Sequence, residues 1–166
     1  MFRITIVILL IGFSGCKAKE KNQPGSVKKE KADIEKVVLS DLNGNPVDVN
    51  QYKGKTVFLN FWATWCKPCL EEMPSIQKAQ QILKDEDVVF LLASEETADQ
   101  IREFENSHHF NFDYVRAENL AELGIMGLPT TFIYDARGKR RFSDMGFRKW
   151  DKQSNLDLLK NISKSK

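Results

Sequence analysis

Two cysteines three residues apart are the side chains in this sequence best suited to chemistry. Cys66 and Cys69 frame the segment Cys66-Lys67-Pro68-Cys69, which follows a short apolar run and precedes a stretch with helical periodicity. Thiols at positions i and i+3 on the first turn of a helix are close enough to form a strained, exposed disulfide. The free N–H groups and the positive end of the helix dipole stabilise a thiolate on the first cysteine. We therefore predict that Cys66 is a redox nucleophile and that a buried Cys69 resolves the mixed disulfide.

The residues between the cysteines fit this chemistry, and two other interpretations of the spacing stay open. Lys67 adds a positive charge that we expect to lower the pKa of Cys66 further, and Pro68 suits a first helical turn. A zinc site would need two more ligands, for which only His108 and His109 offer nitrogen, and adjacent histidines suit one tetrahedral ion poorly. A purely structural disulfide closing so small a ring would stabilise little. We expect no metal.

The elements around this segment indicate an α/β domain. The apolar run 56–61 predicts a central strand covered on both faces, and 68–83 predicts a helix with Pro in its first turn. Strand character at 35–40, the turn signal Asn43-Gly44-Asn45-Pro46 and alternation after it predict an N-terminal β-hairpin. Further strands are predicted at 88–93, 112–115, 130–134 and 140–145, and further helices at 97–107, 120–123 and 150–162. This order implies a mixed central sheet with helices on both faces.

The first residues are typical of a targeting segment. One arginine precedes a ten-residue apolar run, which is too short for a hydrocarbon core that needs about 20 residues and is typical of a signal peptide. The run ends in Phe13-Ser14-Gly15-Cys16, which resembles a bacterial lipobox and predicts lipidation of Cys16. We expect residues 1–16 to be a lipoprotein signal peptide, 17–34 a flexible Lys-rich tether and 35–166 the folded domain.

Composition narrows the class of partner. Apolar residues make up 42% of the 166, enough to build a core. Residues 1–31 hold seven of the 25 basic residues and two of the 23 acidic ones, so the remainder carries 18 basic and 21 acidic side chains. Because the folded part is mildly acidic, we expect no nucleic-acid partner.

Two separate motifs carry a family resemblance over about residues 35–162. The segment 61–69 (FWATWCKPC), followed by Glu72 and Pro74, resembles the thioredoxin superfamily, and more narrowly the TlpA/ResA-like membrane-anchored thiol-disulfide oxidoreductases. The segment 127–132 (GLPTTF) resembles the family's loop in which a cis-proline faces the disulfide. The resemblance implies a thioredoxin fold with a central αβ insertion at about residues 97–115.

The resemblance also implies roles for individual residues. Pro129 would be cis and shape the groove where an extended substrate docks on the backbone of Leu128 and on Thr130, with Trp62 beside it. Trp65 would shield the disulfide. Glu72, one helical turn beyond Cys69, would lie partly buried with a raised pKa and pass protons to and from Cys69. Thioredoxins proper carry a buried Asp where this sequence has Asn60, which cannot titrate.

The function implied is that of a lipid-anchored, extracytoplasmic disulfide reductase, in which the Cys66–Cys69 couple serves without a bound cofactor. Its partners would be disulfide-containing proteins, such as apocytochromes c, and a membrane thiol electron donor, and we expect a monomer. A disulfide-donating oxidase of the same fold is the alternative. A thiol peroxidase is disfavoured because Leu59 and Ala63 replace the Pro and Thr of that motif. A tethered binding domain or holdase, using an apolar groove around Trp62, Trp65 and Pro129, would not need the two thiols.

Overall fold

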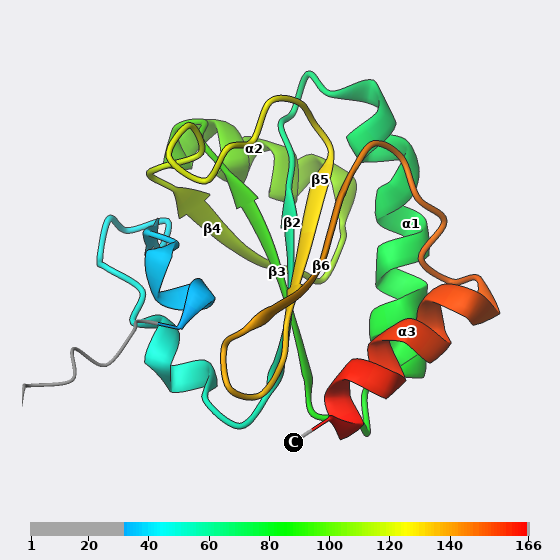
Figure 1. Cartoon of the computed structure of the whole chain (residues 1–166). Helices are drawn as coiled ribbons and strands as arrows, with labels where there is room; N and C mark the ends of the chain where they lie inside the picture. Colours follow the sequence, from blue (N-terminus) through cyan, green and yellow to red (C-terminus); the bar gives the residue numbers. More distant parts are fainter. Residues whose placement is uncertain (1–31, 166) are drawn as a thin grey trace, which may run out of the picture.

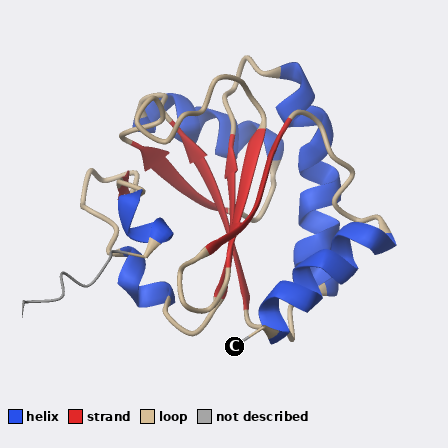
Figure 2. Cartoon of the chain, in the orientation of Figure 1, coloured by secondary structure: helices blue, strands red, loops and turns tan. Residues whose placement is uncertain are grey.

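A six-stranded mixed sheet flanked by helices organises the protein. The computed structural model describes residues 32–165, and Figures 1 and 2 show its arrangement. In the sheet the strands follow the order β1-β4-β3-β2-β5-β6. The strands are β1 (Leu39–Ser40), β2 (Thr56–Phe61), β3 (Val88–Ser94), β4 (Asp113–Ala117), β5 (Thr130–Tyr134) and β6 (Arg140–Met145), and the α-helices are α1 (Lys67–Ile82), α2 (Ala98–His108) and α3 (Gln153–Lys164).

Strand direction follows from the connections. The pairs β2–β3 and β3–β4 are parallel and are joined through α1 and α2, whereas β1–β4, β2–β5 and β5–β6 are antiparallel. Every residue of β2 is buried, as expected of a central strand covered on both faces. The mixed sheet and the inserted α2–β4 unit confirm the predicted thioredoxin fold with its central αβ insertion.

Side chains from the two faces of the sheet enter two separate hydrophobic cores. Phe58 of β2 lies in one core with apolar residues of all three α-helices, including Ile76, Ile101 and Leu159. Leu59, the next residue, lies in the other core, which is covered by two 3-10 helices, η1 (Asp33–Lys36) and η2 (Val49–Tyr52). In Figure 1 the blue and cyan 3-10 helices lie on one side of the sheet, and α1 and α3 lie on the other. Helices do cover both faces, but the α-helices share one face, a division that the sequence did not predict.

The predicted N-terminal hairpin forms, but its second arm is shorter than expected. Its turn forms, because the Asp41 carboxylate accepts hydrogen bonds from the N–H groups of Asn43 and Asn45, both at 2.8 Å. Its second arm pairs around a bridge between Ser40 and Pro46, where the N–H of Asp41 donates to the Asn45 carbonyl at 2.8 Å and the N–H of Val47 donates to the Leu39 carbonyl at 2.9 Å. After it Asp48 accepts a hydrogen bond from a backbone N–H and begins η2 instead of a strand.

Two further boundaries differ from the prediction. Residues 120–123 form a turn that ends at Gly124, whose φ is +72°, so the short helix expected there is wrong. The folded part begins before residue 35, because Ile34 is buried in the second core and the Asp33 carboxylate accepts a hydrogen bond from the N–H of Arg140 at 3.1 Å. The proposed tether at 17–34 is therefore shorter at its C-terminal end.

The predicted signal peptide and Cys16 lie outside the described residues. Among the helices that the structure describes, none combines the length and the apolar character needed to cross a membrane.

Candidate active site

The two cysteines form a disulfide where β2 leads into α1. Cys66 is the N-cap of α1, and the N–H of Cys69 donates to the Cys66 carbonyl at 2.9 Å. The sulfur atoms are bonded at 2.02 Å, with the Cα atoms 5.3 Å apart. Cys69 is fully buried, as predicted, but Cys66 keeps only 4% of its surface exposed. The expectation of an exposed disulfide is therefore wrong, because neighbouring residues of the apolar core enclose both sulfurs.

Lys67 and Pro68 occupy the exposed side of the first turn of α1. The Lys67 ammonium lies 3.9 Å from the Glu71 carboxylate, and both side chains are more than half exposed. The positive charge predicted to act on Cys66 thus lies in water beside an acidic partner, which weakens its effect on the thiol. The helix N-terminus itself remains the main stabilising feature for a thiolate at Cys66.

Glu72 is a buried acid on the same helix. Its side chain is 1% exposed, where we expected partial burial. Its Oε1 accepts a hydrogen bond from Asn60 Nδ2 at 2.7 Å, and its Oε2 accepts one from the N–H of Arg148 at 3.0 Å. Burial raises the pKa of Glu72 to about 7, although both hydrogen bonds oppose the rise. This acid therefore changes charge near neutral pH, which suits a group that takes up and releases protons.

The loop before β5 brings a cis-proline to the same end of the sheet as the disulfide. The Leu128–Pro129 bond is cis, as the resemblance implied. Leu128 is half-buried, and the carbonyl of Pro129 accepts a hydrogen bond from Gly146 N–H at 2.7 Å. Thr130 was predicted to contact the substrate, but its side chain is buried and donates to the Gly127 carbonyl at 2.6 Å.

Comparison with known proteins agrees with this geometry. The model of the AhpC/TSA family matches residues 29–143, which is more than half of the chain. The chain belongs to this family. A thiol-disulfide oxidoreductase ResA from Bacillus thuringiensis subsp. konkukian is 34% identical, over 84% of this chain and 83% of its own. A thioredoxin-like protein of Bacillus subtilis is 31% identical, over 92% and 94%.

A solved structure gives the same result at the level of the fold. An exposed lipoprotein thioredoxin from Streptococcus pneumoniae superposes with a TM-score of 0.64 and 25% identity, covering 75% of this chain and 98% of its own. With relatives of this kind and a Cys66–Cys69 disulfide at a helix start, the chain is a thiol-disulfide oxidoreductase of the thioredoxin fold.

The two tryptophans of the oxidoreductase motif lie in opposite environments. Trp62 is fully buried, and its ring packs on Phe104 and Tyr114, with centroids 4.6 and 5.5 Å away. The predicted role of Trp62 in a substrate groove is wrong, because it continues the alternation of β2 and points into the core. Trp65 is 72% exposed, so most of its ring is open to water.

The surface groove nearest the cis-proline loop is formed by other residues. It has a volume of about 370 Å³ and lies between the loop 123–126 and β6, with Met126, Thr130 and Met145 among its lining residues. Met126 and Met145 are 88% and 61% exposed. Methionine side chains adapt to irregular partners, so this surface is suited to a protein substrate.

Sequence reasoning missed a carboxylate that holds the active-site loop. Glu96 directly precedes α2 but does not cap it, because Thr97 and Gln100 form the capping box there. The Glu96 carboxylate accepts two hydrogen bonds from Thr64, one from its N–H and one from its hydroxyl, both at 2.7 Å. Thr64 lies two residues before Cys66, so Glu96 fixes the chain that leads into the disulfide.

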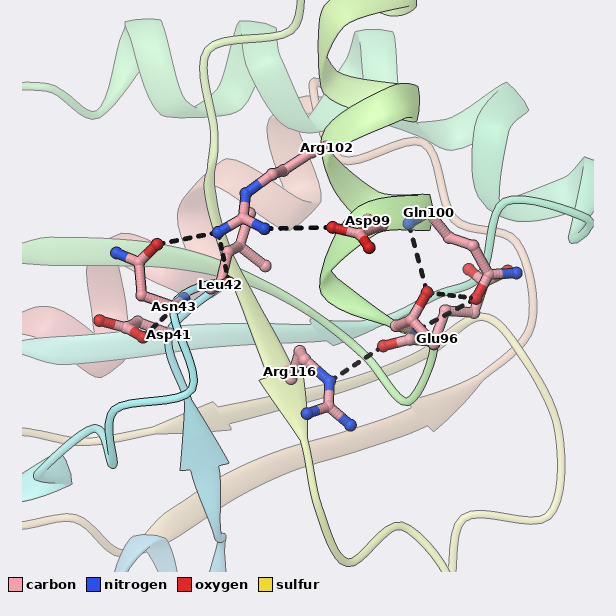
Figure 3. Close-up of polar contacts among 9 residues, drawn as sticks. Asp41, Leu42, Asn43, Glu96, Asp99, Gln100, Arg102 and Arg116 are labelled. Atoms are coloured by element: carbon pink, nitrogen blue, oxygen red, sulfur yellow. Dashed lines mark hydrogen bonds and ion pairs between the residues drawn. The ribbon is translucent and has the colours of Figure 1, made fainter.

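The inserted unit supports Glu96 in turn. Figure 3 shows Arg116 of β4 directed at the backbone of Glu96, whose carbonyl accepts from Arg116 Nε at 3.1 Å. On α2, Arg102 donates to the Leu42 carbonyl and to Asn43 Oδ1, at 2.5 and 2.8 Å. The α2–β4 insertion is thereby attached both to the active-site loop and to the N-terminal turn.

The two histidines considered as metal ligands lie at the end of α2. The ring of His108 stacks on Phe104, with centroids 3.9 Å apart, and His109 caps the helix with a φ of +53°. Within residues 32–165, no group of three or more His, Cys, Asp or Glu side chains gathers as a metal site would require.

Proposed function

We propose that this thiol-disulfide oxidoreductase is an extracytoplasmic, lipid-anchored reductase of protein disulfides. The observation that carries the proposal is the Cys66–Cys69 pair at the start of α1 with the buried Glu72 one turn further along. A nucleophile at the helix N-terminus, a buried resolving thiol and a proton acceptor near neutral pH are together what dithiol exchange requires.

The exchange has two steps. In the reduced enzyme the Cys66 thiolate attacks one sulfur of a substrate disulfide, so that a mixed disulfide forms and one substrate sulfur leaves as a thiolate. Cys69 then attacks the Cys66 sulfur, which closes the Cys66–Cys69 disulfide and releases the second substrate sulfur. Two electrons pass from the enzyme dithiol to the substrate. Glu72, when ionised, accepts the proton that Cys69 must lose in order to attack.

The direction of electron flow is argued from the charges around the thiols. A thiolate at the active site stabilises the reduced form and makes a couple more oxidising. Because Glu72 is buried and ionises near neutral pH, its negative charge disfavours a neighbouring thiolate. Lys67, which would act in the opposite sense, lies exposed beside Glu71. Both features favour a reductase over a disulfide donor.

The substrate would dock at the cis-proline loop. We assign this role to the backbone of Leu128 and Thr130, to Pro129, and to the exposed ring of Trp65. An extended substrate strand would gain main-chain hydrogen bonds along the loop, as in other cases of strand addition. Its side chains would then meet the groove that contains Met126 and Met145.

The location and the wider partners rest on the sequence and on the relatives. Lipidation at Cys16 would hold the domain to a bacterial membrane, with a membrane thiol donor recharging it and apocytochromes c among its substrates. The similarity to an exposed lipoprotein thioredoxin supports an extracytoplasmic position. We expect Cys16→Ala to release the full chain from the membrane fraction, whereas retention on the membrane would refute the lipid anchor.

The reduction potential of the Cys66–Cys69 couple tests the direction directly. The full chain is equilibrated against glutathione and dithiothreitol buffers, and the fraction of disulfide is read by thiol alkylation. A potential below about −220 mV supports a reductase, because the dithiol of such a couple gives up its electrons readily and needs a strong donor to restore it. A value near about −120 mV, typical of a strong oxidant, overturns the proposed direction in favour of a disulfide donor.

A further inference from the structure

Arg148 lies in the loop between β6 and α3, and its side chain is fixed on three sides. Its Nε donates to the Asp144 carboxylate at 3.0 Å, and Nη2 contacts the same oxygen. Its Nη1 donates to Asn155 Oδ1 at 3.0 Å. The guanidinium also lies over the rings of Phe142 and Trp150, 5.1 and 5.6 Å from their centroids. A side chain held by two hydrogen-bonding partners and two aromatic faces has little freedom to move.

This fixed side chain determines where the backbone of the same residue lies. The N–H of Arg148 donates to Glu72 Oε2 at 3.0 Å, although the two residues are 76 positions apart in the sequence. A second connection lies beside it, where the N–H of Trp150 donates to Ser75 Oγ at 3.0 Å and Ser75 donates to the Glu72 carbonyl at 2.8 Å. The loop is therefore attached to α1 both at the carboxylate of Glu72 and at its backbone.

We propose that Arg148 is a positioning residue for thiol-disulfide exchange, which orients the buried Glu72 carboxylate through its N–H and, together with Asp144, sets the charge that this carboxylate faces. The proposal rests on the proton-transfer role given to Glu72 above. It adds that charged groups at the protein surface influence the ionisation of Glu72, because the side chains of Arg148 and Asp144 are 33% and 40% exposed.

The charges around Glu72 support this assignment. The side chains that β2 and β5 bring to this site, Asn60 and Thr131, are both neutral. The Asn60 amide donates to the Glu72 carboxylate and to the Thr131 hydroxyl. From β6 and the following loop come one acid, Asp144, which raises the pKa of Glu72, and one base, Arg148, which lowers it. On α1 itself, Cys69 lies one helical turn before Glu72 and is buried as Glu72 is. The Asp144–Arg148 pair is therefore the charged environment that can be altered without touching the thiols.

Titration of Glu72 in the oxidised protein tests the proposal, because the disulfide does not titrate. The full chain is prepared with ¹³C-labelled glutamate carboxyl groups, and the Glu72 signal is assigned by its loss in Glu72→Gln. We expect Arg148→Met to raise the titration midpoint of Glu72 by roughly one pH unit, the low end of the effect of a nearby opposite charge. We expect Asp144→Asn to lower the midpoint, since it removes a negative charge. Opposite shifts distinguish an electrostatic role from a general loosening of the fold.

The matched control is Arg141→Met, which removes the same charge from an exposed position on β6, the strand that carries Asp144. Its Glu72 midpoint should coincide with that of the unmodified protein. If Arg148→Met also leaves the midpoint unchanged, or if Asp144→Asn moves it in the same direction as Arg148→Met, the positioning role is refuted.

A second measurement separates this inference from the role of Glu72 itself. In the reduced variants, the pH profile of disulfide exchange should shift in the same direction as the Glu72 midpoint. If the midpoint moves and the exchange profile does not, Arg148 still positions Glu72, but Glu72 is not the proton carrier. The proposed mechanism would then fail while the positioning role stands.

Discussion

Replacing Glu72 by glutamine should remove a large part of the pH dependence of stability. Burial raises the pKa of Glu72 from 4.5 to about 7, so between these values the folded chain holds a proton that the unfolded chain has released. The contribution of Glu72 to the free energy of unfolding is therefore fully present below pH 4.5, and it is lost as the pH rises through 7. At 1.36 kcal/mol for each pH unit, the loss amounts to about 3 kcal/mol.

Glutamine cannot ionise, so Glu72→Gln should escape this loss. Its amide will mismatch one of the donors at Asn60 or Arg148, which changes stability by an amount that does not depend on pH. The useful quantity is thus the unfolding free energy of the variant minus that of the unmodified protein. This difference should rise by about 3 kcal/mol between pH 4 and pH 8, because only the unmodified protein loses stability as Glu72 ionises.

Urea unfolding of the oxidised protein at pH 4, 6 and 8 measures this difference. The disulfide is kept closed so that the thiols do not contribute to the titration. Glu71→Gln is the control, because Glu71 is the next residue on α1 but has an exposed side chain, and its difference should stay constant. A constant difference for Glu72→Gln as well would show that Glu72 has an ordinary pKa and would refute the argument from burial.

Three further predictions concern the rest of the site. Cys69→Ser should accumulate a mixed disulfide with a substrate such as insulin, seen on non-reducing gels, and Cys66→Ser should not. Equal trapping by both variants would show that the assignment of Cys66 as the nucleophile is wrong. Trp62→Ala should cost about 3–5 kcal/mol in urea unfolding, whereas Trp65→Ala should change stability by less than about 0.5 kcal/mol but weaken substrate reduction. Glu96→Gln should cost about 1–3 kcal/mol and slow exchange, and a stable variant with an unchanged rate would exclude its role in the loop.

The features that the sequence predicted well are those set by neighbouring residues. The apolar run of β2 and the proline at the start of α1 are local signals, and α1 begins and ends within one residue of the predicted 68–83. The disulfide follows, because the spacing of Cys66 and Cys69 on one helical turn brings the thiols together whatever surrounds them.

Two residues of the site carried local signals that indicate their true environments. Alternation along β2 puts Trp62 on the same face as Phe58, which predicts burial. The spacing of Thr97 and Gln100 is that of a capping box, which leaves Glu96 free for another partner.

The surroundings of Glu72 depend on contacts between distant parts of the chain. Arg148 meets Glu72 only because β6 and the loop after it fold back beside α1, and no local pattern marks that contact. The covering of the second core by η1 and η2 has the same origin, since short 3-10 helices follow side-chain caps and packing more than periodicity.

The two outer strands of the sheet carry features that hinder another chain from pairing with them. A sheet edge exposes unpaired backbone groups that invite another chain to add a strand. At one edge, β1 is two residues long and offers little to pair with. At the other, β6 places Arg140 and Arg141 at its start and changes register against β5 between Ile133 and Tyr134. Short length, charge and irregular pairing are recognised ways of protecting an edge, so both edges of this sheet are guarded against adding strands from further copies of the chain.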